Sequence, residues 1–192
     1  SMGGADRYYQ NVSFRELYGY AFELTLPNDY MTVFDCVFDD LVPYAGYQND
    51  AFISYGAVGS HDKNLIAHNE FKNAAAPYGT GIKTYTTAQM LLEANAFYNC
   101  NDMGISWKSS TAYSVARNNT FDSCNRAIGI GGYETCDNNE ISHNFFRNST
   151  GSALYMNDSG TTSNTYIYRN TLADYMHFRL IEIDDSPFTV YN

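Results

Sequence analysis

Short apolar phrases separated by turn residues follow one another along nearly the whole chain. Within each phrase apolar and polar positions roughly alternate, which is the pattern of a β-strand with one buried face. The phrases are AFELTL, AFISYG, GIKTYT, GISWKS, AIGIGG, ALYMND and LIEIDD. Asn, Gly, Ser and Asp gather between the phrases and predict turns. The pattern therefore predicts many short strands and an all-β fold.

A triplet of the form Asn-x-Phe recurs at a nearly constant distance. It starts at Asn69, Asn95, Asn119, Asn144 and, with Leu in place of Phe, at Asn170. Upstream, Val12 and Cys36 occupy the same slot, and an insertion of about eight residues precedes Asn69. A period of about 25 residues with two or three strands in each unit predicts a solenoid of about seven coils.

These units resemble the coil repeats of right-handed parallel β-helix proteins of the pectate-lyase-like superfamily, over about residues 8–185. The five Asn residues match the slot of that family's Asn ladder. Stacked amides can bond across strands about 4.8 Å apart, and Asn tolerates the left-handed conformation of a tight turn. We expect one β-helix over residues 5–192, with residues 1–4 a tag remnant. A β-sandwich is the rival fold, but the regular period argues against it.

Several residues that look chemically active occupy repeated slots of this alignment. Cys100 and Cys124 share a slot with Ala74 and Ser149, which predicts an interior ladder of small residues rather than a reactive thiol pair. The four Cys residues leave the redox compartment open. A second interior stack is predicted from Phe71, Phe97, Phe121 and Phe146.

Two histidines precede the Asn slot. His68 and His143 occupy a slot whose other members are too varied for an interior position, which predicts an exposed turn. They lie three coils apart, about 14 Å along the axis, and so cannot share one metal ion.

Composition narrows the functional classes. The formal net charge of -10 disfavours binding to nucleic acid, because phosphate groups would be repelled. No apolar run is long enough to span a membrane. The chain has 18 Tyr, a residue that often stacks on sugar rings. The resemblance implies an extracellular or cell-surface protein, although no secretion signal is visible.

The outward side of the second phrase in each coil is the expected site of chemistry, as the resemblance implies. If Phe22, Phe52, Ile82, Ile105, Ile128, Leu154 and Ile181 point inward, alternation sends the next residue and the one two beyond it outward. The outward residues, coil by coil, are Glu23 and Thr25, Ile53 and Tyr55, Lys83 and Tyr85, Ser106 and Lys108, Gly129 and Gly131, Tyr155 and Asn157, and Glu182 and Asp184.

This face predicts binding of an acidic polysaccharide. Two of only 11 Lys and Arg residues, Lys83 and Lys108, fall on adjacent coils and suit carboxylate or sulfate groups. Tyr residues lie beside them for stacking, and the two Gly residues leave a bare patch for a ligand. The alternative is an outer face without a ligand, on which Gly simply marks a bend.

The segment SWKSSTAY, followed by RNNTF, resembles the base-bearing coil of alginate- and chondroitin-cleaving β-helix lyases. The resemblance implies β-elimination with Lys108 as the base, and Tyr85 would then donate the proton. Those enzymes carry an Arg in the next coil where this chain has Gly131, and Arg126 is expected in the preceding turn. His61, in the inserted segment, is the other candidate for acid–base work and is expected to overhang the same face.

Other functions remain open at this point. Glycoside hydrolysis would need paired carboxylates, for which Glu182, Asp184 and Asp185 are the candidates. The same oxygens could bind Ca²⁺, and no other cofactor is expected. A non-catalytic module of a surface or tail-spike-like protein is a further alternative. Because no amphipathic capping helix is visible, uncapped ends could support an oligomer, or the chain could be a piece of a longer protein.

Overall fold

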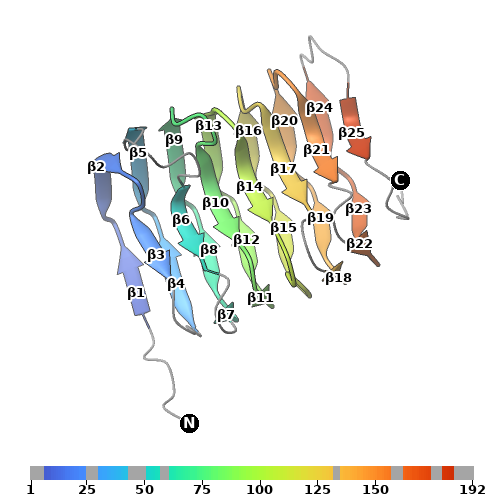
Figure 1. Cartoon of the computed structure of the whole chain (residues 1–192), viewed down its shortest axis with the longest axis horizontal. Coiled ribbons are helices and arrows are strands. Elements are labelled where there is room, and N and C mark those ends of the chain that lie inside the picture. The colour runs from blue at the N-terminus through green and yellow to red at the C-terminus, as the bar shows by residue number, and fades with distance from the viewer. Residues whose placement is uncertain are drawn as a thin grey trace.

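The protein is an all-β solenoid. The computed structural model describes residues 7–24, 30–42, 51–56, 61–131, 135–156, 162–173 and 179–183. Within these ranges all regular structure is strand, and no helix is long and apolar enough to cross a membrane. The strands follow one another as successive turns from the N-terminal to the C-terminal end of the molecule (Figure 1). The expected all-β parallel solenoid is confirmed.

Three long sheets form the walls, and every strand pair in them is parallel. The first sheet contains β1 (Arg7–Gln10), β4 (Met31–Phe34), β8 (Leu65–Ala67), β12 (Leu91–Glu93), β15 (Val115–Arg117), β19 (Glu140–Ser142) and β23 (Tyr166–Tyr168). The second contains β2 (Ser13–Tyr18), β5 (Val37–Val42), β9 (Glu70–Ala74), β13 (Ala96–Cys100), β16 (Thr120–Asp122), β20 (Phe145–Arg147) and β24 (Thr171–Ala173). The third contains β3 (Phe22–Leu24), β6 (Ala51–Tyr55), β10 (Thr80–Thr84), β14 (Met103–Trp107), β17 (Arg126–Ile130), β21 (Ser152–Met156) and β25 (Arg179–Ile183).

A fourth, short line of strands closes the turns in the later part of the chain. It consists of β7 (His61–Asp62), β11 (Thr87–Ala88), a bridge at Ala112, β18 (Cys136–Asp137) and β22 (Thr162–Ser163). In the described part of the chain, the full four-sided path is thus present in about five turns, fewer than the expected seven coils.

The Asn ladder is confirmed, and its geometry shows how it fixes the coil spacing. The Oδ1 atom of Asn119 accepts two hydrogen bonds from Asn95. One comes from the backbone N–H of Asn95 at 2.9 Å, and the other from its side-chain Nδ2 at 3.1 Å. Asn119 in turn donates to Asn144, and the same pattern links Asn69 to Asn95 and Asn144 to Asn170. Each amide therefore ties a turn to the next one.

The left-handed conformation lies one residue before the slot expected for it. His68, Asn118 and His143 have φ values of 56°, 55° and 55°. The ladder Asn residues themselves are not among the residues with positive φ. The reason is that the ladder side chain has to point inward, so the residue before it makes the turn. His68 and His143 are exposed there, as expected.

The core is a continuous stack of aromatic rings along the axis. Phe14, Phe38, Phe71, Phe97, Phe121 and Phe146 stack with ring centroids 4.8 to 5.2 Å apart. Cys100 and Cys124 are buried beside this stack and form no disulfide, and Ala74 pairs with Cys100 in the same slot. Both predicted interior ladders are therefore present.

Candidate functional site

The third sheet presents one regular row of outward residues. The register aligns Glu23, Ser54, Lys83, Ser106, Gly129 and Tyr155 across six of the strands, and the backbone of Glu182 in β25 pairs with Tyr155. The residues on either side of this row belong to the core. Those before it are Ile53, Ile82, Ile105, Ile128 and Leu154, and those after it are Tyr55, Trp107, Ile130 and Met156. Alternation therefore places the row on the outside of the solenoid.

The expected outward positions of Ile53 and Tyr55 are wrong. Phe22 and Ile82 pair with Ile53, not with Phe52, so Ser54 is the outward residue of β6. The phrase contains two adjacent large apolar residues, and both are fully buried. Tyr55 is buried as well, with its hydroxyl 3.9 Å from the sulfur of Met31, and burial raises its pKa. Tyr55 is a core residue with no surface for a sugar ring.

The expected overhanging position of His61 is also wrong. His61 starts β7 and is fully buried, because its backbone pairs with Thr87 and its slot faces the interior. Its ring lies edge-on to the Tyr55 ring with centroids 5.5 Å apart. The structure therefore places His61 inside the solenoid, away from the outward row.

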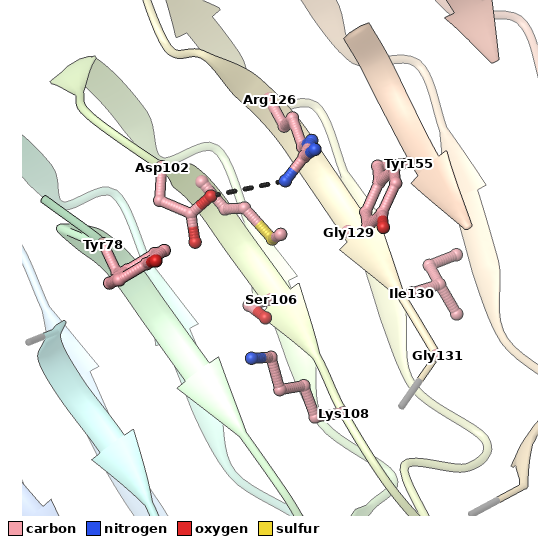
Figure 2. Close-up of a pocket in the computed structure, with 10 residues that line it drawn as sticks. Tyr78, Asp102, Ser106, Lys108, Arg126, Gly129, Ile130, Gly131 and Tyr155 are labelled. Atoms are coloured by element: carbon pink, nitrogen blue, oxygen red, sulfur yellow. Dashed lines mark ion pairs between the residues drawn. The ribbon is translucent and has the colours of Figure 1, made fainter. Parts of the chain in front are cut away.

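A hollow of about 200 Å³ lies over β14, β17 and β21 on the outer side of the third sheet (Figure 2). Its lining consists of Tyr78, Asp102, Met103, Ser106, Lys108, Arg126, Gly129, Ile130, Gly131 and Tyr155. Figure 2 shows Lys108 and Arg126 extending into the hollow from its two ends, with Tyr78 and Tyr155 at its sides. Two of the predicted cations and one predicted aromatic residue thus meet in one place.

Arg126 is held by two neighbours. Its Nη1 atom lies 3.6 Å from Oδ1 of Asp102, and its guanidinium carbon lies 3.9 Å from the centre of the Tyr155 ring. Such a stacked cation is attracted by the electron-rich face of the ring. Arg126 is the first residue of β17, in the coil that follows Lys108, and not in the preceding turn as expected.

The two lysines of the face repel each other. Burial lowers the pKa of Lys108, and the positive charge of Lys83 lowers it further, while Tyr85 and Asp102 act in the opposite direction. Lys83 is only 5% exposed, and its Nζ atom lies 5.3 Å from the centre of the Tyr85 ring. Lys108 therefore gives up its proton more readily than an ordinary lysine does.

The bare patch expected at the two glycines is wrong for Gly129. A Cβ atom at Gly129 would lie 2.4 Å from the sulfur of Met103, so the Met103 side chain already covers this backbone. Gly131 has a φ of 108°, which side chains rarely adopt, so it marks a bend. The floor of the hollow is thus a thioether and a hydroxyl, from Met103 and Ser106, rather than open backbone.

The remaining predicted residues lie at the C-terminal edge. Asn157, Asp184 and Asp185 lie outside the described residues, and Glu182 is placed only as a backbone position of β25 beside Tyr155. Among the His, Cys, Asp and Glu residues that the structure describes, no group of three or more could hold a metal ion.

Sequence reasoning missed Asp102 and Tyr78. Both come from turns between the apolar phrases, Asp102 just before β14 and Tyr78 just before β10. One signal could have found Asp102. Met103 pairs with Arg126 across two neighbouring coils, and Asp102 directly precedes Met103 in the sequence. Across parallel strands, such a position puts an acid next to a base.

The comparisons with known proteins agree with the architecture. Residues 5–174 match the family described as Right handed beta helix region. No match was found among curated proteins or among solved structures. The family match spans well over half of the chain, and the parallel solenoid of the structure agrees with its description. The chain therefore belongs to the right-handed β-helix family.

Proposed function

We propose that the protein binds an acidic polysaccharide in the hollow on the third sheet, as a pectate-lyase-like member of the right-handed β-helix family that acts outside the cell or at its surface. One observation carries the proposal. Lys108 and Arg126 extend into the same hollow, and Lys83 lies beside it, although the whole chain has only 11 basic residues and a net charge of -10.

The polar and aromatic groups around these cations suit a sugar acid. A guanidinium and an ammonium form their strongest hydrogen bonds with carboxylate or sulfate oxygens. Tyr78 is 48% exposed at the side of the hollow, and an exposed tyrosine ring is suited to stacking on a pyranose. Ser106 adds a hydroxyl to the floor, where it can bond a ring hydroxyl.

Binding can be measured by calorimetry with oligogalacturonate, with an oligomer of alginate, and with a neutral glucan of the same length. We expect the acidic oligomers to bind and the neutral glucan not to bind. Replacing Lys108→Ala or Arg126→Ala should weaken binding by about tenfold or more, because each removes a charged hydrogen-bond donor. Added salt should weaken the remaining affinity, since part of the attraction is between exposed charges.

Two matched variants control for loss of charge alone. Lys72→Ala removes a lysine paired with Glu70 on the second sheet, and Arg147→Ala removes an arginine paired with Asp122 there. Both should bind as the unmodified protein does. Equal weakening by the control variants, or equal binding of the neutral glucan, would contradict the proposed site.

A second candidate function is cleavage of the bound polymer by β-elimination, which the lowered pKa of Lys108 favours. In this reaction a base removes the proton next to a uronate carboxylate, the bond to the leaving glycosidic oxygen breaks, and a double bond forms. Neutral Lys108 would take the proton, and Arg126 would neutralise the carboxylate. Tyr85, half-buried beside Lys83, would donate the proton to the leaving oxygen.

The assay is the ultraviolet absorbance of unsaturated uronate products from pectate, alginate, chondroitin and heparan. We expect product formation to rise with pH, because the base acts in its neutral form and its pKa lies below the usual lysine value. Lys108→Ala should abolish the product while Lys72→Ala retains it. Product that persists in Lys108→Ala would exclude this base, and acidic oligomers that bind without reacting would leave the protein a binding module.

A further inference from the structure

A carboxylate lies among the cations of the hollow. Of the described residues that line the hollow, Asp102 is the acidic one. Its side chain is 16% exposed and that of Arg126 is 30% exposed, so both charges are largely withdrawn from water. An acidic ligand that binds here therefore meets the negative charge of Asp102, which is already paired with Arg126, one of the cations that would bind the ligand.

The backbone fixes Asp102 in this place. The N–H of Asp102 donates to the carbonyl of Gly79 at 3.0 Å, and the carbonyl of Asp102 accepts from the N–H of Arg126 at 2.8 Å. The two residues are therefore neighbours across the coil spacing, and their side chains leave adjacent backbone positions. The contact between their charges follows from the register of the solenoid.

The ion pair itself is loose compared with others in the protein. Asp102 and Arg126 are 3.6 Å apart, whereas Arg147 lies 2.7 Å from Asp122 and Arg117 lies 2.9 Å from Glu93. Distances of about 2.7–2.9 Å are normal for charged hydrogen bonds. Tyr155 contacts one face of the guanidinium, so Arg126 has a second contact besides Asp102 that favours its position. A guanidinium has five donors, so an incoming anion can bond to Arg126.

The charged groups that face Asp102 come from three strands of the same sheet. Arg126 on β17, Lys108 after β14 and Lys83 on β10 all lower its pKa, but burial raises it more, and the pKa of Asp102 ends above that of an ordinary aspartate. The buried thiol of Cys100 on β13 also senses its charge. Asp102 therefore takes up a proton at a higher pH than an exposed aspartate would.

We propose that Asp102 is a specificity-determining residue that competes with acidic ligands for Arg126, so that the hollow binds anions more tightly once Asp102 is neutral; the inference rests on the proposed function. A bound anion near Asp102 adds like-charge repulsion, which favours the protonated carboxyl group. Binding is then coupled to proton uptake, and affinity rises as the pH falls. While Asp102 is ionised it disfavours weakly charged ligands, which compete poorly for Arg126.

The test compares the unmodified protein with Asp102→Asn, which keeps the shape of the side chain and removes its charge. The probe is a short dextran sulfate, whose sulfate esters stay ionised where uronates would titrate, with unsulfated dextran as the neutral control. Binding is measured from about pH 7.5 down to about pH 4.5, a range that lies above the pKa of an ordinary aspartate. We expect the affinity of the unmodified protein to increase as the pH falls.

For Asp102→Asn we expect roughly fivefold tighter binding than the unmodified protein at neutral pH, and a clearly shallower pH profile, in which only the other titrating groups of the acidic chain contribute. Asp102→Glu keeps the charge and should keep the pH dependence. The matched control is Asp122→Asn, which neutralises the acid of the Arg147 pair on the second sheet and should leave both affinity and profile unchanged.

The outcomes separate this inference from the proposed function. If the unmodified protein binds the sulfated probe with a flat profile, or if Asp102→Asn binds no more tightly, the role of Asp102 is overturned while the anion site stands. If neither protein binds at any pH, both proposals fail. A flat pH profile of the unmodified protein overturns the inference without any substitution, so a folding defect in Asp102→Asn cannot hide that result.

Discussion

At the scale of single residues, the ladder asparagines illustrate what a sequence can and cannot reveal. Their repeat predicted a ladder of stacked amides, since a side chain that both donates and accepts can bond to copies of itself above and below. The left-handed turn residue could not be predicted in the same way. Ala94 and Arg169 adopt it, although neither residue type signals such a turn. The ladder bonds impose that conformation on whatever residue comes before the Asn.

Removing one ladder asparagine should therefore be costly. In Asn119→Ala, the backbone N–H of Asn95 and the carbonyl of Leu92 lose their buried partners. We expect the free energy of unfolding to fall by about 3 kcal/mol, because each unsatisfied buried group costs about 1–3 kcal/mol. Chemical denaturation would measure the loss.

The neighbouring residue provides the control for this prediction. Asn118 has a φ of 55° and is exposed, so Asn118→Gly keeps the turn and should change stability by less than about 0.5 kcal/mol. If Asn118→Gly destabilised the protein as much as Asn119→Ala does, the ladder would not be the main bond between coils.

At the scale of strands, alternation predicted the outward row well wherever a phrase has a single dominant apolar residue. It failed in β6, because Phe52 and Ile53 are adjacent and either could have pointed inward. The sequence pattern places Gly81 and Gly104 within apolar phrases and predicts no role for them, yet as the second residues of β10 and β14 they have a packing role. A Cβ atom at Gly81 or Gly104 would lie 2.7 or 2.6 Å from the ring of Phe97 or Phe121. The ring stack thus determines where glycine is required.

Residues of the candidate site could be predicted where they lie in or next to strands, but not where they lie in turns. Lys83 and Lys108 could be predicted because they lie at or next to the strands of the alternating pattern. Asp102 and Tyr78 could not, because the turns between phrases have no period that places a side chain. Arg126 was assigned to a turn because the phrase that follows it, AIGIGG, begins one residue later, although Arg126 already belongs to β17.

At the scale of the whole molecule, charge separates the hollow from the rest of the surface. The protein carries a net charge of -10, yet Lys108 and Arg126 extend into one hollow of a single sheet. In the proposed function, the net negative charge of the molecule would repel an acidic polymer and these cations would attract it, so binding would have to be local. The regular solenoid supports this arrangement, because side chains from three successive coils are held at a fixed spacing.

The most direct test of this account is an amide NMR titration of the protein with an acidic oligosaccharide. We predict that shift changes gather on Asp102–Lys108 and Arg126–Gly131, the segments that line the hollow, and are small on the first and second sheets. A neutral oligosaccharide of the same length should produce much smaller changes. Shift changes centred on another sheet, or none at millimolar acidic ligand, would contradict the claim that the hollow is an anionic-glycan site.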